Sequence, residues 1–521
     1  MHEVAKLLDI TLASCESHEL VQVFSGNKLL QAMDPFAMCY GGHQFGHWAE
    51  HLGDVRAIIL GQTLNQTGQR FALQLKDNGP TLYSRTADGP AILRSSIREF
   101  LCSEAMHHLG IPTIRALCVV ATDKSVMRDM FHECNLRAES GAIVCRVVPR
   151  FTRFGNFKIL ALCNDNDLLR KLLHYTLVTD FLDLGVSGRG SYIHLFREIC
   201  TRKTTMIAHW MRVGFLHGVI NTDNMSILGL TINYSPYGWL EDYDPDWTPN
   251  ISDGQHHCYR FGVQLQVALW NLAQLGKALM PLVEDTGPLK RALAKYNECF
   301  NTQWQEMMVE KLGFMTFCTP SHTELISELP EVLQRVETDM TIFFRRLALL
   351  DTSPTTSDKA LLAPFSAAYY QPKALSDTHR KLALQWLRRY DEKVRTEGMP
   401  EHERRASMDR VNPKYVLRNY LAQLDIDRSE QSDYGLVTEL LEVLRHPYDE
   451  QADKKSSQTS GRNGCDSGPV APYCRVAYEW QERNTDEVLG YKDNDFLDMA
   501  NGRSNRYSGI AANSEMLKTL V

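Results

Sequence analysis

The sequence lacks three features that would assign it to a specialised class of protein. Its 13 cysteines include no C-x-x-C pair, which argues against a zinc ribbon, a thioredoxin-type site or a disulfide scaffold and favours a reducing compartment. It contains no run of about 18 apolar residues, so no membrane-spanning helix is predicted. Basic residues are not in excess, because the formal net charge is −7, and this argues against a nucleic-acid-binding surface.

Two further absences concern targeting and metal binding. The residues Met1 to Val4 show neither the basic nor the apolar region of a secretory signal, and their early acidic residue is unlike a mitochondrial transit peptide. We therefore expect a cytoplasmic protein, with a mitochondrial location open if the source is eukaryotic. The one dense cluster of soft ligands is His256-His257-Cys258. Neighbouring side chains on one element point apart, so metal binding there is not favoured.

The composition is otherwise that of an ordinary globular protein. Hydrophobic residues make up 44% and charged residues 23% of the 521 positions, and this length predicts roughly two to four domains. Apolar or alternating patterns predict strands over residues 57–60, 71–76, 116–122 and 142–148. From residue 165 the pattern becomes helical, most clearly over 168–184, 196–216, 262–279, 287–312, 324–350, 377–397 and 415–444.

This change from strands to helices predicts two lobes and an extension. We expect a nucleotide-binding N-lobe over residues 1–160, a helical C-lobe over 161–350 and a C-terminal helical extension over 351–450. Residues 454–468 are rich in Ser, Gly and Asn and have no apolar periodicity, which predicts a disordered linker. Residues 451–521 are therefore expected to be a linker and an unplaced tail.

A helix is expected to begin at Ser95 and to stop before Pro112. Ser96 and Glu99 fit a capping box, which would give Glu99 a structural role at the helix start. Glu104 lies closer to the apolar stripe of this helix. Helical phase alone therefore favours Glu104 over Glu99 as the partner of a strand lysine.

Three basic residues lie near predicted strand ends. Lys76 ends a strand in a strand–turn–strand pattern typical of nucleotide-binding lobes. Arg146 and Arg153 flank Pro149, and two such arginines can bind phosphate in a bidentate manner. Without further information, solvated surface charge is the simpler interpretation of all three.

The polar loop, His217–Ile227, gathers hydrogen-bonding side chains between two apolar elements. Its central residues are Asn221, Thr222, Asp223 and Asn224. Carboxylate and amide oxygens suit Mg²⁺ or Mn²⁺, and an aspartate beside them could accept a proton from a hydroxyl. The alternative is an ordinary turn in which Asn and Asp bond their own backbone.

Six stretches together resemble the selenoprotein O family, called YdiU in bacteria. They are Tyr40–Gly46, Leu73–Lys76, Leu93–Phe100, Arg153–Gly155, His217–Leu230 and Asn412–Tyr420. The resemblance runs from about residue 25 to 450 in family order. It implies an α+β, bilobal, protein-kinase-like fold with a strand-rich N-lobe, a helical C-lobe and a C-terminal helical extension. It also implies protein adenylyltransferase activity.

The resemblance implies roles for the basic residues. Lys76 would hold nucleotide phosphate and pair with Glu99, as the strand lysine and helix glutamate of kinases do. This overrules the phase argument for Glu104. Arg146 and Arg153 would hold the terminal phosphate of an ATP molecule that is reversed relative to its orientation in kinases.

The resemblance also implies the remaining contacts to nucleotide and metal. Gly53, Val55 and Arg56 would belong to a loop on the phosphate side, and Asp88 with Gly89 to a second nucleotide-contacting turn. In the polar loop and after it, Asp223 would be the proton acceptor, while Asn224 and Asn233 would be ligands of Mg²⁺ or Mn²⁺.

Three positions depart from the family pattern. Asn233 stands where the family has a metal-binding aspartate, so metal affinity should fall because an amide brings no charge. Val55 replaces a glycine, which is costly if that position needs a positive φ. Pro90 replaces an arginine and removes one cation. The cysteine-containing C-terminal ending of the family is also missing.

The sequence leaves three candidate functions. The leading one is an ATP-dependent protein adenylyltransferase that uses Mg²⁺ or Mn²⁺ and modifies Ser, Thr or Tyr hydroxyls, with no nucleic-acid or membrane partner. The second is a weakened pseudoenzyme that binds ATP or a partner, because Asn233 replaces the metal-binding aspartate. The third is an ordinary protein kinase, which is disfavoured because no H-R-D loop or D-F-G triplet stands in the proper place.

Overall fold

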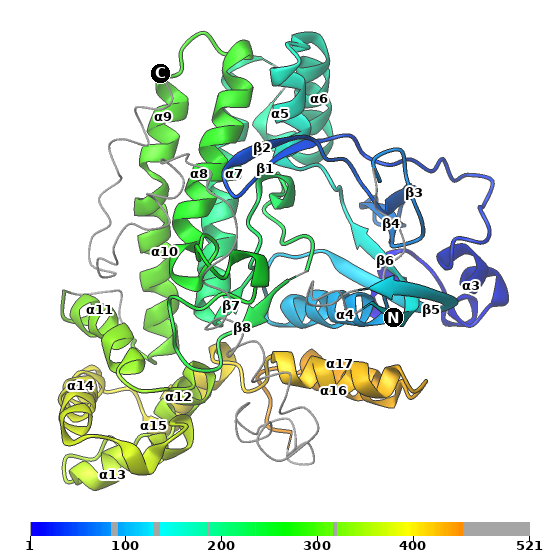
Figure 1. The fold of residues 1–521 in the computed structure, drawn as a ribbon. Helices are drawn as coiled ribbons and strands as arrows, with labels where there is room; N and C mark the ends of the chain where they lie inside the picture. The colour runs from blue at the N-terminus through cyan, green and yellow to red at the C-terminus, as the bar shows by residue number, and fades with distance from the viewer. Residues whose placement is uncertain are drawn as a thin grey trace.

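The computed structural model describes residues 2–84, 92–128, 136–185, 188–234, 236–315 and 320–451. Two predicted site residues, Asp88 and Gly89, lie outside these ranges, as do Pro90 and the predicted linker and tail beyond residue 451. Within the described ranges a strand-rich N-terminal region is followed by a helical C-terminal region (Figure 1). The predicted fold class is thereby confirmed.

The N-terminal region is built around a four-stranded antiparallel sheet. Its strands are β3 (Ala57–Leu64), β4 (Arg70–Lys76), β5 (Arg115–Arg128) and β6 (Arg137–Val148), in the order β3-β4-β6-β5. Because side chains alternate along a strand, Gln74 and Lys76 share one face of β4. The register sets Gln74 opposite Arg146 of β6, so three polar side chains meet on this face.

Helix α4 (Leu93–His108) packs against β5 and β6. It begins before Ser95, and its N-cap residue Ile92 makes no side-chain cap. The predicted capping box is therefore wrong. The hydroxyl of Ser96 instead donates to the main-chain oxygen of Ala142 at 3.2 Å. The carboxylate of Glu99 accepts a hydrogen bond from Nζ of Lys76. Ser96 and Glu99 therefore bond to residues distant in the chain instead of capping their own helix.

Smaller elements surround this sheet. They are α1 (His2–Leu7), α2 (Leu12–Cys15), α3 (His18–Phe24) and the hairpin of β1 (Gly41–Gln44) and β2 (His47–His51). Val4 of α1 and Phe24 of α3 share a small core with Leu75 of β4. The hairpin forms a separate two-stranded sheet and lies beside the helical region rather than on the main sheet (Figure 1).

The helical region follows β6. Its helices are α5 (Phe154–Leu162), α6 (Asn166–Asp180), η1 (Leu182–Leu184), α7 (Arg189–Arg212), α8 (Gln264–Leu279), η5 (Met280–Leu282), α9 (Gly287–Ala294), α10 (Tyr296–Lys311), α11 (Pro320–Gln334) and α12 (Met340–Leu347). Between α7 and α8 lie β7 (Phe215–Leu216), η2 (Thr222–Asn224), β8 (Gly238–Trp239), η3 (Ile251–Asp253) and η4 (Phe261–Val263). The polar loop thus lies between two long helices, α7 and α8, in the chain.

The C-terminal extension returns to the N-terminal region. It contains α13 (Asp358–Leu362), η6 (Ala363–Ala368), η7 (Pro372–Ala374), α14 (Asp377–Glu397), α15 (Glu401–Val411), α16 (Asn419–Ser429) and α17 (Gly435–Arg445). Helices α16 and α17 pack against α4 (Figure 1). Nη2 of Arg98 donates to Oδ1 of Asn419 at 3.2 Å and to the main-chain oxygen of Tyr237 at 3.0 Å. Helix α4 is therefore held by the sheet on one side and by the extension on the other.

Across the described residues, no helix combines the length and the apolarity that crossing a membrane would require.

Candidate active site

The predicted pair of Lys76 and Glu99 is present, and Arg146 extends it. Nζ of Lys76 contacts Oε2 of Glu99, and Nη1 of Arg146 lies 3.0 Å from Oε1 of the same carboxylate. Burial by itself would raise the pKa of Glu99, but the charges of Lys76 and Arg146 outweigh it and hold that pKa below its ordinary value. Glu99 is therefore ionised and fixes two cations on adjacent strands.

Arg146 also connects this pair to the polar loop. Its Nη1 donates to Oδ1 of Asn233 at 2.7 Å, and Nδ2 of Asn233 donates to Oδ1 of Asn224 at 2.7 Å. The backbone of Asn233 is left-handed, with φ of +61°, a conformation that asparagine adopts more readily than most residues. One continuous chain of hydrogen bonds thus runs from Lys76 to the polar loop.

Asp223 is buried at the centre of the polar loop. Nη1 of Arg153 donates to the main-chain oxygen of Asp223 at 3.1 Å, and Nη2 of Arg153 lies 3.6 Å from Oδ1 of Asp54. Oδ1 of Asp223 is buried and has no hydrogen-bond partner among the described residues. Burial raises the pKa of Asp223 to about 6, against the opposing charge of Arg153. Such a carboxylate is suited to accepting a proton from a bound hydroxyl.

The segment Gly53–Arg56 connects the hairpin to β3. Gly53 has φ of +61°, and a Cβ there would lie 2.2 Å from the ring of Tyr83, so only glycine fits. Val55 is not among the described non-glycine residues with positive φ, so the backbone strain considered for this position does not arise. Nε of Arg56 lies 2.9 Å from Oδ1 of Asp77.

The amide side chains of Asn224 and Asn233 are the pair predicted to bind a divalent cation. They lie in direct contact, but the pair carries no negative charge and Oδ1 of Asn233 already accepts from Arg146. Mg²⁺ prefers carboxylate and phosphate oxygens and keeps several waters. The residues therefore fit a cation that takes its negatively charged ligands from nucleotide phosphates.

Comparisons with known proteins establish the family of this chain. Residues 1–445 match the family described as protein adenylyltransferase SelO. The chain belongs to the SelO family. A protein nucleotidyltransferase YdiU of Rhodopirellula baltica is 50% identical over 482 residues, which cover 89% of each chain.

Two further relatives of the same name are similarly close to this SelO-family chain. The protein of Azoarcus sp. is 51% identical over 452 residues, covering 87% of this chain and 86% of the relative. The protein of Xanthomonas axonopodis pv. citri is 50% identical over 469 residues, covering 89% of each. Membership of the family makes the chain a nucleotidyltransferase with ATP as substrate, and the resemblance noted in the sequence is confirmed.

Sequence reasoning about the SelO-family site missed Gln74 and Asp54. Oε1 of Gln74 accepts from Nη2 of Arg146, and its Nε2 donates to Oδ2 of Asp54 at 3.0 Å. Both side chains are buried. The alternation of β4 could have indicated Gln74, which shares a face with Lys76. No motif or periodicity in the sequence around Asp54 indicates that it belongs to the site.

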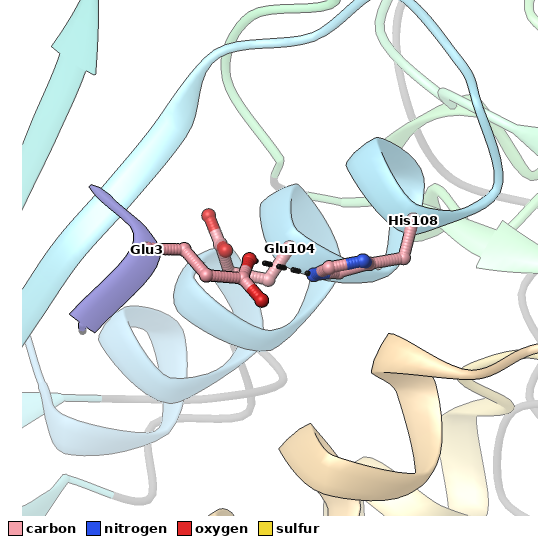
Figure 2. A group of neighbouring side chains, drawn as sticks. All are labelled: Glu3, Glu104 and His108. Atoms are coloured by element: carbon pink, nitrogen blue, oxygen red, sulfur yellow. Dashed lines mark ion pairs between the residues drawn. The ribbon is translucent and has the colours of Figure 1, made fainter. Parts of the chain in front are cut away.

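A second group of acidic and histidine side chains lies away from the site. Glu3, Glu104 and His108 bring their ligand atoms within 4.8 Å of one another (Figure 2), and no other trio of this kind occurs in the described part of the chain. Nη2 of Arg115 lies 2.6 Å from Oε2 of Glu104 and 3.3 Å from Oε2 of Glu3. A guanidinium already supplies the positive charge here, so the cluster fastens α1 to α4, and Glu104 is not the partner of Lys76.

Proposed function

We propose that this SelO-family chain transfers AMP from ATP to serine, threonine or tyrosine hydroxyls of proteins. The observation that carries the proposal is the buried Oδ1 of Asp223, which has no hydrogen-bond partner among the described residues. Asp223 precedes Asn224, the residue at which the chain of hydrogen bonds from Lys76 ends. An acceptor hydroxyl beside Asp223 gives its proton to this carboxylate while its oxygen attacks the α-phosphorus. The bond between the α-phosphorus and the bridging oxygen breaks, and pyrophosphate leaves with the electron pair.

The fixed cations of the site suit the polyphosphate. Glu99 holds Lys76 and Arg146 in place, and Arg153 is held against the polar loop. Pre-ordered guanidinium groups bind phosphate in a bidentate manner at little entropic cost. We assign Arg146 and Arg153 to the terminal phosphate and Lys76 to the chain of phosphates. The proposed reaction requires the α-phosphate to lie beside the Asp223 carboxylate.

The remaining assignments concern the loop and the metal. We assign Gly53, Val55 and Arg56 to the phosphate side of the nucleotide. For Asp88 and Gly89, which lie outside the described residues, we keep the nucleotide-contacting role that the family resemblance implies. Asn224 and Asn233 would hold Mg²⁺ or Mn²⁺ together with the nucleotide. When bound, that ion supplies positive charge that neutralises the phosphates during transfer.

The cysteines support a reducing compartment for this reaction. All nine cysteines among the described residues are free, and Cys39 and Cys163 are exposed. Free thiols suit the cytoplasm. We therefore propose a cytoplasmic enzyme whose partners are ATP and acceptor proteins.

Labelled ATP tests the reaction. The purified chain is incubated with ATP labelled at the α- or the γ-phosphate, with Mn²⁺ or Mg²⁺, and label in protein is counted. We expect label from the α-position alone, and no label with Asp223→Asn. Label from the γ-position alone would establish phosphoryl transfer and overturn the proposal.

A second candidate is a nucleotide-binding pseudoenzyme. The observation that favours it is the neutral side chain of Asn233, whose oxygen is engaged by Arg146. A site with less charge binds its catalytic ion more weakly and stabilises the transition state less. ATP binding without transfer of either label would support this candidate.

A further inference from the structure

The hairpin β1–β2 carries the motif Tyr40–Gly46, to which nucleotide binding gives no role. The main-chain nitrogens of Leu52 and Gly53 each donate to the main-chain oxygen of Tyr40 at 3.0 Å and close the base of the hairpin. Its first strand packs against α5 (Figure 1). It also packs against η2 of the polar loop. A segment of the N-terminal region therefore forms part of the wall around Asp223.

Glycines allow this close approach. A Cβ at Gly42 would lie 2.6 Å from Oδ1 of Asp223, and a Cβ at Gly155 would lie 2.0 Å from the main-chain oxygen of Gly41. Neither position has room for a side chain. The main chain of the hairpin is consequently in direct contact with the Asp223 carboxylate and with the first turn of α5.

Hydrogen bonds fasten the hairpin to the polar loop. The main-chain nitrogen of His43 donates to Oγ1 of Thr222 at 2.7 Å, and that of Phe45 donates to the hydroxyl of Tyr259 at 2.8 Å. The Tyr259 hydroxyl donates in turn to Oδ1 of Asn221. The hairpin thus holds two residues of the polar loop, one directly and one through a tyrosine.

Tyr259 is itself firmly held. Oδ2 of Asp253 accepts from the main-chain nitrogen of Tyr259 at 2.7 Å, and Oδ1 accepts from that of Cys258 at 2.8 Å. The ring of Tyr259 lies 5.1 Å from the ring of Phe45 and is 1% exposed. Tyr259 is therefore held in a fixed position and connects the hairpin to the polar loop.

We propose that the β1–β2 hairpin positions the proton acceptor of the transfer reaction, with Gly42, Thr222 and Tyr259 as positioning residues for Asp223. The inference rests on the proposed AMP transfer. Gly42 limits the space around the carboxylate, while the two hydroxyls fix the loop that carries it. A displacement of the acceptor by about 1 Å is enough to slow transfer strongly.

The same contacts predict no effect on nucleotide affinity. None of the hydrogen bonds between the hairpin and the polar loop involves Lys76, Arg146 or Arg153, the three residues assigned to the phosphates. Loosening the hairpin should therefore lower the rate of transfer at saturating ATP and leave the dissociation constant of ATP unchanged. A role confined to folding would change neither quantity in a protein that remains folded.

The test uses three variants and their controls in the full chain. Thr222→Val and Tyr259→Phe each remove one hydroxyl, and Gly42→Ala adds a Cβ against Asp223. Thr222→Ser keeps its hydroxyl and should restore transfer. Two substitutions of the same type serve as remote controls. Tyr390→Phe removes a buried hydroxyl that donates to the main-chain oxygen of Leu312, and Gly190→Ala meets no atom within 4 Å.

Three measurements are made on each protein. They are the AMP transfer rate at saturating ATP, the ATP dissociation constant by calorimetry, and the amide hydrogen exchange of residues 41–51 and 219–225. We expect transfer to fall by about tenfold or more in the three variants, with ATP affinity within about twofold of wild type. Exchange should accelerate in both segments for Tyr259→Phe. The remote controls should behave as wild type.

Two outcomes would overturn the inference. The first outcome is a variant in which the hairpin exchanges its amide hydrogens faster but AMP transfer is no slower than in the control Tyr390→Phe. The other is faster exchange confined to residues 41–51, which would mean that the hairpin does not fix the loop. If the wild-type chain transfers no AMP, the proposed function fails, and the exchange of the two segments alone decides whether the hairpin fixes the loop.

Discussion

Nη1 of Arg146 donates a hydrogen bond of 2.7 Å to Oδ1 of Asn233, joining residues 87 positions apart in the chain. The acceptor is neutral where the resemblance to the SelO family leads us to expect an aspartate. Arg146 therefore keeps Glu99 as its charged partner, and Nδ2 of Asn233 donates to Oδ1 of Asn224. The charge missing from this position gives the first prediction.

Replacing Asn233 by aspartate should tighten Mn²⁺ binding in the presence of ATP by about tenfold or more, because a carboxylate adds charge to a neutral donor pair. The left-handed backbone at this position, with φ of +61°, also accepts aspartate. Free Mn²⁺ can be measured by electron paramagnetic resonance during titration. AMP transfer should rise in the same variant.

Asn164→Asp is the matched control for this substitution. Asn164 also has a left-handed backbone, with φ of +58°, but lies exposed after α5. This control should leave Mn²⁺ affinity unchanged. If Asn233→Asp binds Mn²⁺ no better than wild type, position 233 is not a metal ligand.

Lys76→Ala should weaken ATP binding by about tenfold or more, because it removes a charged contact to phosphate. Glu99 keeps Arg146 as a partner, so the fold should persist. Isothermal titration calorimetry measures the affinity. Lys28→Ala, which breaks an exposed pair with Glu19, is the control. Equal ATP affinity in Lys76→Ala and wild type would contradict the nucleotide-binding role of this face of the sheet.

Glu99→Gln and Glu104→Gln should have different effects, although both carboxylates are buried on α4. Glu99→Gln should weaken ATP binding, because Lys76 and Arg146 lose the charge that orients them. Glu104→Gln should leave ATP affinity unchanged. It should lower the free energy of unfolding by about 3 kcal/mol, because Arg115 loses its buried partner.

Calorimetry and urea unfolding on these two glutamate variants give a direct comparison. Each variant is the control for the other, since both change one buried carboxylate of the same helix. A loss of ATP affinity in Glu104→Gln as large as that in Glu99→Gln would restore the assignment based on helical phase.

Much of the fold could be predicted because apolar and polar side chains alternate along a strand. The alternation of Leu73 and Leu75 with Gln74 and Lys76 indicates strand β4 from four consecutive residues. The start of α4 could not be predicted in this way. The hydroxyl of Ser96, which fits a cap in sequence, is used by a main-chain oxygen 46 positions away.

The candidate site was less predictable from local patterns than the fold. The resemblance to the family identified Glu99 as the partner of Lys76, whereas helical phase favoured Glu104 for that role. The contact between Gln74 and Asp54 spans 20 positions and that between His43 and Thr222 spans 179. Contacts between residues so far apart in the chain form only in the folded protein, so no periodicity or motif in the sequence predicts them.

Asp425 provides a prediction of pH-dependent stability. Its side chain is fully buried on α16, Oδ2 has no hydrogen-bond partner among the described residues, and Oδ1 lies 3.4 Å from the hydroxyl of Ser429. Burial raises the pKa of Asp425 to about 7, whereas an unfolded aspartate has a pKa of about 4. Because the folded pKa is the higher one, this group favours folding most below pH 4. The contribution is lost as the pH rises to 7.

Asp425→Asn removes this ionisation and should therefore stabilise the protein more at high pH. The gain in unfolding free energy should be about 2–3 kcal/mol larger at pH 8.5 than at pH 5, since each unit of pKa shift corresponds to about 1.4 kcal/mol. Urea unfolding of wild type and variant at both pH values measures it. Asp427→Asn, a partly exposed position on the same helix, is the control. A gain from Asp425→Asn that is equal at pH 5 and pH 8.5 would mean that Asp425 is not protonated in the folded protein at neutral pH.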